Sequence, residues 1–144
     1  ILDAGTWAAS AKGGQAAVMV LVQDPETSAY MSALNAEIQG RPGTDPFYGA
    51  PTVVVVLGDG EQLNWLQDGS LVMGNLMNAA AAVGLGSCWV HRAREVFAGA
   101  EGQALLRQWG IQGKYAGVAH CLLGYPDGPL PEPKPRREHR IYRR

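Results

Sequence analysis

The sequence has 144 residues, of which 47% are hydrophobic and 17% are charged, and its formal net charge is -1. This length and composition favour one globular domain with a single core and exclude a disordered chain. A charge near zero also gives no overall basic character of the kind that favours nucleic acid. Six cations nevertheless lie close together near the C-terminus, as a solvated tail or as an anion-binding arm: Lys134, Arg136, Arg137, Arg140, Arg143 and Arg144.

Cysteine and histidine usage gives no indication of a metal centre. Cys88 and Cys121 each lie in an apolar, strand-like run, which predicts two buried reduced thiols and no disulfide. The three histidines are scattered and no CxxC occurs, so no metal site is expected. The sequence also contains no P-loop, no GxSxG, no HExxH and no secretory signal, and we therefore expect a cytoplasmic protein.

The first third of the chain predicts helix, loop, strand and helix. Residues 1–8 look like the end of a helix without its own N-terminal cap, which suggests that the chain begins within an element. Residues 9–15 form a loop of small residues with one positive charge, and the apolar run 17–22 predicts a strand. A helix follows, with Asp24 as its N-cap and Pro25 at its first position, and Gly40 ends it. Its apolar stripe is Tyr30, Met31, Leu34 and Ile38.

The middle of the chain predicts a buried strand and a buried helix. Residues 52–57 are a continuous β-branched run, typical of a central strand buried on both faces. Residues 61–67 are expected to be a connector, in which Trp65 is a core anchor or, alternatively, a lid aromatic. The segment from Asp68 to Gly84 has a start signal, a C-cap glycine and apolar residues on nearly every face, which predicts a helix inside the protein. Residues 87–90 then indicate a buried strand.

The last third predicts helix, strand and an extended arm. Residues 94–109 are amphipathic, and two glycines in the middle favour two short helices. Residues 115–125 predict a strand in which His120 is a hydrogen-bonded core histidine. Five prolines in residues 126–135 predict an extended arm, followed by a basic tail with a short strand at 141–142. This element order alone would suit a doubly wound parallel sheet, but no GxGxxG follows any strand.

Five segments, which occur along the chain in the family's order, resemble the FMN-dependent nitroreductase family. The strongest is residues 68–95, DGSLVMGNLMNAAAAVGLGSCWVHRARE, which resembles the family's central helix, glycine turn and strand. Residues 4–15, AGTWAASAKGGQ, resemble its A-P-S-x-x-N-x-Q segment, and residues 45–59, DPFYGAPTVVVVLGD, resemble its alanine-proline strand. YAGVAHCLLGYP at 115–126 resembles its last core strand, and KPRRE at 134–138 resembles its terminal basic motif. The resemblance covers almost the whole chain.

The resemblance implies an α+β fold in which helices flank a central, mostly antiparallel β-sheet. It implies a single nitroreductase-like domain over residues 1–144, with 126–144 as an extended C-terminal arm. It also implies a domain-exchanged homodimer with the flavin at the subunit interface. A second copy would then bury the apolar helix of residues 68–84, and the arm of residues 126–144 would reach over that copy. Asn75 and Asn78 would be interface residues or, alternatively, would bond to a neighbouring helix.

FMN is the cofactor that the resemblance implies, held by residues from four parts of the chain. These residues are Ser10, Lys12, Gln15, Gly86, Ser87, His91, Arg92, Lys134 and Arg136. The first three would lie along the ribityl chain and ring, and the glycine-serine pair would let backbone approach the isoalloxazine. His91 and Arg92 would lie near the polar edge of the ring or the phosphate. The two cations of the arm would pair with the phosphate through charge-assisted hydrogen bonds.

The implied activity is that of an FMN-dependent NAD(P)H oxidoreductase. Hydride from NADH or NADPH would pass through flavin N5 to a nitroaromatic, quinone or related acceptor in a ping-pong cycle, so no side chain is assigned as a catalytic acid or base. The expected partners are a second copy, NAD(P)H and a small aromatic acceptor, without nucleic acid or membrane. The alternative is a truncated, non-catalytic flavin-binding or structural dimer, because the family begins with an Arg-x-Ser-x-Arg helix that this sequence starts after.

Overall fold

Four strands form one antiparallel sheet within residues 1–129 and 131–144, which this computed structural model describes. The strands are β1 (Ala17–Val22), β2 (Thr52–Asp59), β3 (Gly86–Val90) and β4 (Tyr115–Gly124), in the order β1-β2-β4-β3. Every neighbouring pair is antiparallel. The predicted α+β fold with an antiparallel sheet is therefore confirmed, and the parallel order that the element pattern would also suit is excluded.

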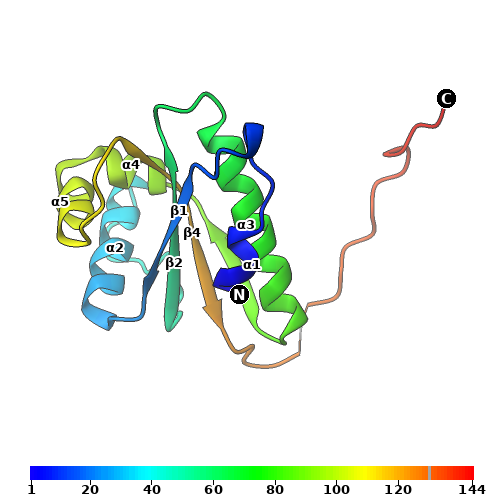
Figure 1. The fold of residues 1–144 in the computed structure, drawn as a ribbon. Helices are drawn as coiled ribbons and strands as arrows, with labels where there is room; N and C mark the ends of the chain where they lie inside the picture. The colour runs from blue at the N-terminus through cyan, green and yellow to red at the C-terminus, as the bar shows by residue number, and fades with distance from the viewer. Residues whose placement is uncertain (130) are drawn as a thin grey trace.

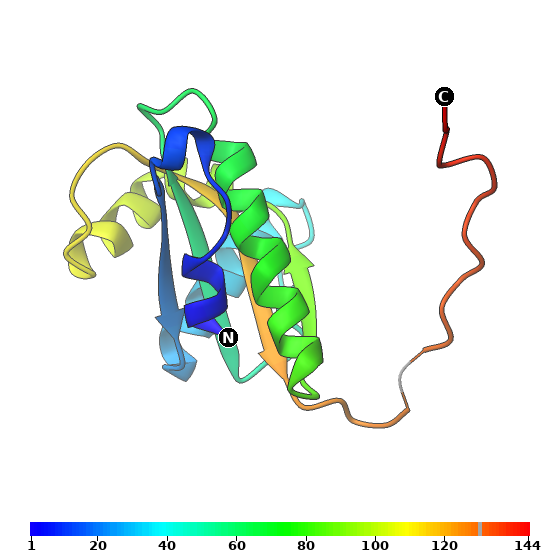
Figure 2. The same ribbon diagram turned by 45° about the vertical axis from the view of Figure 1, so that its right-hand side comes forward.

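Helices cover both faces of the sheet (Figures 1 and 2). One face carries α1 (Leu2–Thr6) and α3 (Trp65–Ala82), and the other carries α2 (Pro25–Ile38), α4 (Ala93–Ala98) and α5 (Ala100–Gln108). A short 3-10 turn, η1 (Ala11–Gly13), lies in the loop between α1 and β1. The separate α4 and α5 confirm the two short helices that the glycines of this segment favour.

The central strand β2 supplies both halves of the core. Residues Val53 to Leu57 are fully buried, because β1 and β4 pair with the two edges of β2 and helices cover its two faces. Side chains alternate along a strand, so Val53 and Val55 pack in the α2 and α4 layer while Val54 and Val56 pack beneath α3. The predicted central strand buried on both faces is confirmed.

The sequence signals correctly predict the start of α2 and the end of α3, but not the start of α3. Asp24 accepts a hydrogen bond from the Thr27 N–H at 2.8 Å, as an N-cap should. Gly84 has φ +80°, and the following residue, Leu85, donates its N–H to the Ala80 carbonyl at 2.9 Å, which closes α3 in a left-handed cap. However, α3 begins at Trp65, one turn before the predicted start, so the expected 61–67 connector was too long.

The predicted burial of α3 on all sides is wrong within one chain. Val72, Met73 and Leu76 are buried against the sheet, but Leu71 is 50% exposed and Val83 is 64% exposed. A helix on one face of a four-stranded sheet has neighbours on only part of its circumference. The outer side of α3 is therefore an apolar surface that residues of this chain do not cover.

Strand β3 lies at the edge of the sheet and is not the buried strand that its composition predicts. Trp89 is 37% exposed and Cys88 is exposed, because β3 pairs only with β4. Both cysteines are free, as predicted, but only Cys121 is buried. Burial raises the pKa of the Cys121 thiol to about 11, with a smaller contribution from the charge of Cys88.

His120 is fully buried on the central part of β4, but its predicted hydrogen bond is absent from the described residues. The ring packs against Phe47, with centroids 5.0 Å apart, and against Phe97, with centroids 6.1 Å apart. Neither ring nitrogen has a hydrogen-bond partner of ordinary geometry. Burial lowers the pKa of His120 to about 4, although the nearby backbone of Val90 and His91 opposes this shift.

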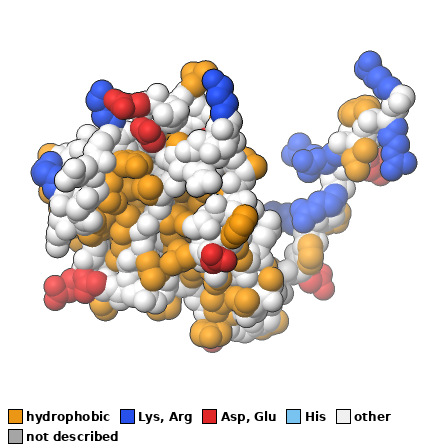
Figure 3. All heavy atoms as spheres, viewed as in Figure 1, with side chains coloured by type: hydrophobic (Ala, Val, Ile, Leu, Met, Phe, Trp, Pro, Cys, Tyr) orange, Lys and Arg blue, Asp and Glu red, His pale blue; other side chains and the backbone are white. Residues whose placement is uncertain are grey.

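The C-terminal arm extends away from the folded body (Figures 1 and 3). Residues 125–129 and 131–144 are exposed and contain no helix or strand, which contradicts the strand predicted at 141–142. Leu130, which the predicted arm includes, lies outside the described residues. A strand needs a paired neighbour, and the described arm has none in a single chain. Residues 131–144 carry six cations and two carboxylates, whereas the preceding part carries six cations and eleven carboxylates. No helix in the described residues is long and apolar enough to cross a membrane.

Candidate functional site

The loop of residues 9–15 holds three of the nine predicted cofactor residues. Ser10 is partly buried, whereas Lys12 and Gln15 are exposed. The Gln15 N–H donates to Ser10 Oγ at 3.0 Å, which closes the loop on itself. Lys12 has φ 54° and Gln15 has φ 48°, so two non-glycine residues adopt left-handed backbone. Such residues are uncommon and persist where the surrounding structure holds them.

Asp68 of α3 is the side chain that ties this loop to the body, and sequence reasoning treated it only as a helix start. Its Oδ1 accepts a hydrogen bond from the Ala11 N–H at 3.0 Å, and the residue is only 6% exposed. A cavity of about 160 Å³ lies beneath the loop, lined by Asp68, Ser10, Gln15 and apolar residues of α1, β1 and α3. The two bonded residues are 57 positions apart, so no local sequence signal could have paired them.

His91 and Arg92 form a second group, where β3 ends and α4 begins. Arg92 has φ 78°, and its guanidinium makes an exposed ion pair of 3.3 Å with Glu95, a kind that contributes little to stability. The His91 carbonyl accepts a hydrogen bond from Asn35 Nδ2 at 2.8 Å. Asn35 is fully buried and also accepts from Gln39 Nε2 at 2.6 Å. This buried amide holds the backbone where β3 ends and α4 begins, and no sequence motif marks it.

Gly86 and Ser87 form a third group, at the opposite end of β3. Gly86 pairs with Gly124 and Ser87 pairs with Leu123. A Cβ on Gly86 would lie 3.4 Å from the Gly124 carbonyl oxygen and 3.8 Å from Pro126 Cγ, which is ordinary van der Waals contact. Nothing in the described part of this chain therefore requires a glycine at position 86.

Lys134 and Arg136 form the fourth group, on the exposed arm. Figure 3 shows the cations of the arm gathered along the chain that leaves the folded body. Neither side chain forms an ion pair with any described residue. One copy of the chain therefore leaves both cations available for an anion and does not bring them to the other three groups.

The 9–15 loop and Gly86 also lie at opposite ends of the sheet. The first residue of β1, Ala17, pairs with Gly58 of β2, which in turn pairs with Ala116 of β4. At the other end of β4, Gly86 pairs with Gly124. Those two β4 positions are eight residues apart, which is roughly 26 Å at about 3.3 Å per residue. A single flavin ring cannot contact both groups within one copy.

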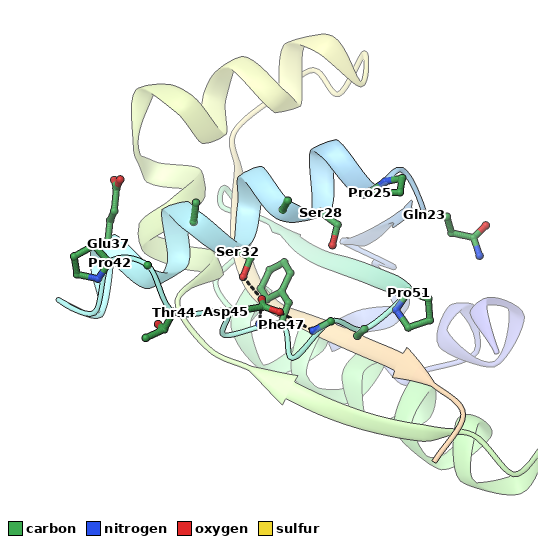
Figure 4. A pocket seen from close by; sticks show the side chains of 15 residues that line it. Gln23, Pro25, Ser28, Ser32, Glu37, Pro42, Thr44, Asp45, Phe47 and Pro51 are labelled. Atoms are coloured by element: carbon green, nitrogen blue, oxygen red, sulfur yellow. Dashed lines mark hydrogen bonds between the residues drawn. The ribbon is translucent and has the colours of Figure 1, made fainter. Parts of the chain in front are cut away.

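A larger cavity lies elsewhere, between α2 and the loop of residues 42–51 (Figure 4). Its volume is about 570 Å³, and its described lining includes two carboxylates, Glu37 and Asp45, but no cation. Burial acts to raise the pKa of Asp45, but hydrogen bonds from Ser32, Gly49 and Phe47 outweigh it and hold this pKa below its ordinary value. A phosphate would therefore meet fixed negative charge in this cavity, which contains none of the nine predicted residues.

Comparison with protein families identifies the class. Residues 1–125 match the nitroreductase family, and the chain therefore belongs to this family, as the five segments indicate. Membership supports a flavin oxidoreductase. No curated protein matches the sequence.

Solved structures confirm the fold. A nitroreductase with bound FMN from Bacteroides fragilis NCTC 9343 is similar with a TM-score of 0.87 and 23% identity, over 98% of this chain and 82% of that one. A nitroreductase with bound FMN from Desulfitobacterium hafniense DCB-2 gives 0.83 and 24%, over 98% and 82%. An oxidized iodotyrosine deiodinase bound to FMN and 3-iodo-L-tyrosine gives 0.73 and 18%, over 98% and 83%.

Proposed function

We propose that this protein is an FMN-dependent oxidoreductase that uses NADH or NADPH to reduce nitroaromatics, quinones or related acceptors. The observation that carries the proposal is the nitroreductase family match over residues 1–125. The FMN in similar structures from B. fragilis and D. hafniense supports the cofactor. The deiodinase has the same fold with another substrate, so the fold itself does not select the acceptor.

The residues present suit a flavin mononucleotide. Lys134 and Arg136 are exposed and make no ion pair among the described residues, so both can donate to a phosphate. Lys12 places a further exposed cation on the 9–15 loop, beside the cavity that Ser10 and Gln15 line. These positions supply positive charge for the phosphate and polar groups for the ribityl chain and ring.

The site requires two copies of the chain, and we therefore include a domain-exchanged homodimer of single-domain subunits in the proposal. The 9–15 loop and Gly86 are roughly 26 Å apart along the sheet, too far for one flavin. The outer side of α3 exposes Leu71 and Val83, an apolar surface that a second copy could cover. The extended arm would carry Lys134 and Arg136 across to the partner.

The protein's part in the reaction is binding, orientation and electrostatics. When bound, FMN supplies hydride acceptance and donation at its N5 atom. Lys12 and Arg92 would supply positive charge near the ring and so favour the extra negative charge of its reduced form. Lys134 and Arg136 would hold the phosphate. No side chain is assigned a proton-transfer step.

The first test is the visible spectrum of the purified protein with added FMN and then NADH or NADPH in the absence of oxygen. We expect a bound-flavin band at roughly 450 nm that bleaches with the pyridine nucleotide and returns with a nitroaromatic or quinone. Bound FMN that neither nucleotide reduces would refute the oxidoreductase. No FMN binding at all would favour the alternative, a structural dimer of the same fold.

A matched pair of arm variants tests the assigned cations. Lys134→Ala with Arg136→Ala should weaken FMN binding by about a hundredfold or more, because the two charge-assisted contacts contribute about 1.5–3 kcal/mol each. Arg143→Ala with Arg144→Ala removes the same charge from the same arm, outside the KPRRE segment. Equal weakening in both pairs would show that only the net charge of the arm matters.

A further inference from the structure

Asp68 has a buried carboxylate that faces the cofactor loop and not its own helix. It is the fourth residue of α3, and its N–H is already bonded to the Asn64 carbonyl at 2.9 Å. Its Oδ1 accepts instead from Ala11, at 3.0 Å, across 57 positions of sequence. Because the residue is only 6% exposed and its carboxylate bonds to a distant loop, it links the helix to the loop.

The close approach of α3 to the sheet places this carboxylate under the loop. Gly69 follows Asp68, and a Cβ there would lie 2.4 Å from Val118 Cγ2 of β4, closer than real atoms approach. Only glycine therefore allows the first turns of α3 to lie this near β4. As a result the Asp68 carboxylate lies in the lining of the small cavity that Ser10 and Gln15 also line.

The loop needs such a tie because its backbone is strained. Lys12 and Gln15 have left-handed φ values of 54° and 48°, which L-residues rarely adopt without support. The tie at Ala11 lies directly before Lys12, and the Ser10–Gln15 bond spans Lys12. Without the tie, the loop would relax toward more ordinary backbone and its side chains would move.

We propose that Asp68 is a positioning residue, whose bond to the Ala11 N–H holds the 9–15 loop in the conformation that presents Ser10, Lys12 and Gln15 to FMN. The assignment rests on the proposed FMN function. It predicts that cofactor affinity depends on an acceptor atom at position 68, and that loss of this atom loosens the loop even when FMN is absent.

The experiment compares Asp68→Leu, Asp68→Asn and wild type by FMN titration and by hydrogen exchange of residues 9–16 without FMN. Leucine keeps the approximate size but removes the acceptor, so we expect about tenfold weaker FMN binding and faster exchange in the loop. Asparagine keeps an acceptor oxygen and should stay within about threefold of wild type. Ser70→Ala is the control, because Ser70 Oγ donates to the Leu66 carbonyl within its own helix, α3.

A second variant tests the same bond from its other end and covers the case in which Asp68→Leu does not fold. Ala11→Pro removes the N–H donor, and Ser10 already has the φ -138°, ψ 154° backbone that a residue before proline prefers. It should weaken FMN binding as Asp68→Leu does, and the double variant should lose little more.

Each outcome decides one question. Wild-type FMN binding in Asp68→Leu, or an Asp68→Asn as weak as Asp68→Leu, would overturn the positioning role and leave the proposed function standing. A wild type that takes up no FMN would overturn both, and the exchange data alone would then report whether the Asp68–Ala11 bond orders the loop.

Discussion

Acid should destabilise this protein through His120 before most carboxylates titrate. The ring is fully buried and its pKa is about 4, against the ordinary 6.5 that applies in the unfolded chain. Because the folded state has the lower pKa, the unfolded chain takes up this proton first as the pH falls. His120 therefore costs no stability above pH 6.5, and the loss grows as the pH falls toward 4.

The magnitude follows from that pKa difference. One pKa unit corresponds to about 1.36 kcal/mol, so the shift from 6.5 to about 4 amounts to about 3.4 kcal/mol at full protonation. At pH 5, where only the unfolded chain is largely protonated at this site, the loss relative to pH 7.5 is about 2 kcal/mol. This is a large part of the stability of a typical domain.

Urea unfolding of wild type and His120→Leu at pH 7.5 and pH 5 measures this loss. Leucine is of similar size and does not titrate, so the variant should lose about 2 kcal/mol less than wild type between the two pH values. His139→Leu removes a histidine from the exposed arm and should keep the wild-type loss. An equal pH dependence in wild type and His120→Leu would refute the reasoning.

Two further predictions concern packing and thiols. Gly69→Ala should cost about 1–3 kcal/mol of folding free energy in a thermal or urea melt, because its Cβ would lie 2.4 Å from Val118 Cγ2. Gly74→Ala, where a Cβ would meet no atom within 4 Å in one chain, should be tolerated better than Gly69→Ala, and equal effects at the two sites would contradict the packing. In native protein a thiol reagent should label Cys88 quickly and Cys121 only on unfolding, because burial raises the pKa of Cys121 to about 11. Mass spectrometry of Cys88→Ser would check this, and fast labelling of that variant would contradict it.

The elements were predictable wherever a local signal decides the backbone. The valine run of β2, the Asp24 cap and the Gly84 left-handed turn each depend on residues close in sequence, and the structure confirms all three. Exposure was less predictable, since it depends on which neighbour is present. The apolar composition of α3 and β3 predicts burial, yet Leu71 and Trp89 are exposed in one chain.

The candidate site was predictable only as a set of residues, not as an assembly. Family resemblance named the 9–15 loop, the two ends of β3 and the arm, but no contact with FMN tests these assignments and they stay predictions. The ties that shape two of these regions join residues far apart in sequence. Asp68 reaches Ala11 across 57 positions and Asn35 reaches His91 across 56, and sequence periodicity carries no information at such separations.

The central position of β2 also has a consequence for how the chain is made. Its run of four valines and a leucine is uncharged, β-branched and free of proline, which is the composition of segments that aggregate when exposed. One of its edges pairs with β4, whose residues 115–124 leave the ribosome long after those of β2. Until then half of the strand's pairing groups are open to other nascent chains. Pairing of β2 with other chains therefore competes with folding until residues 115–124 of the same chain have been made.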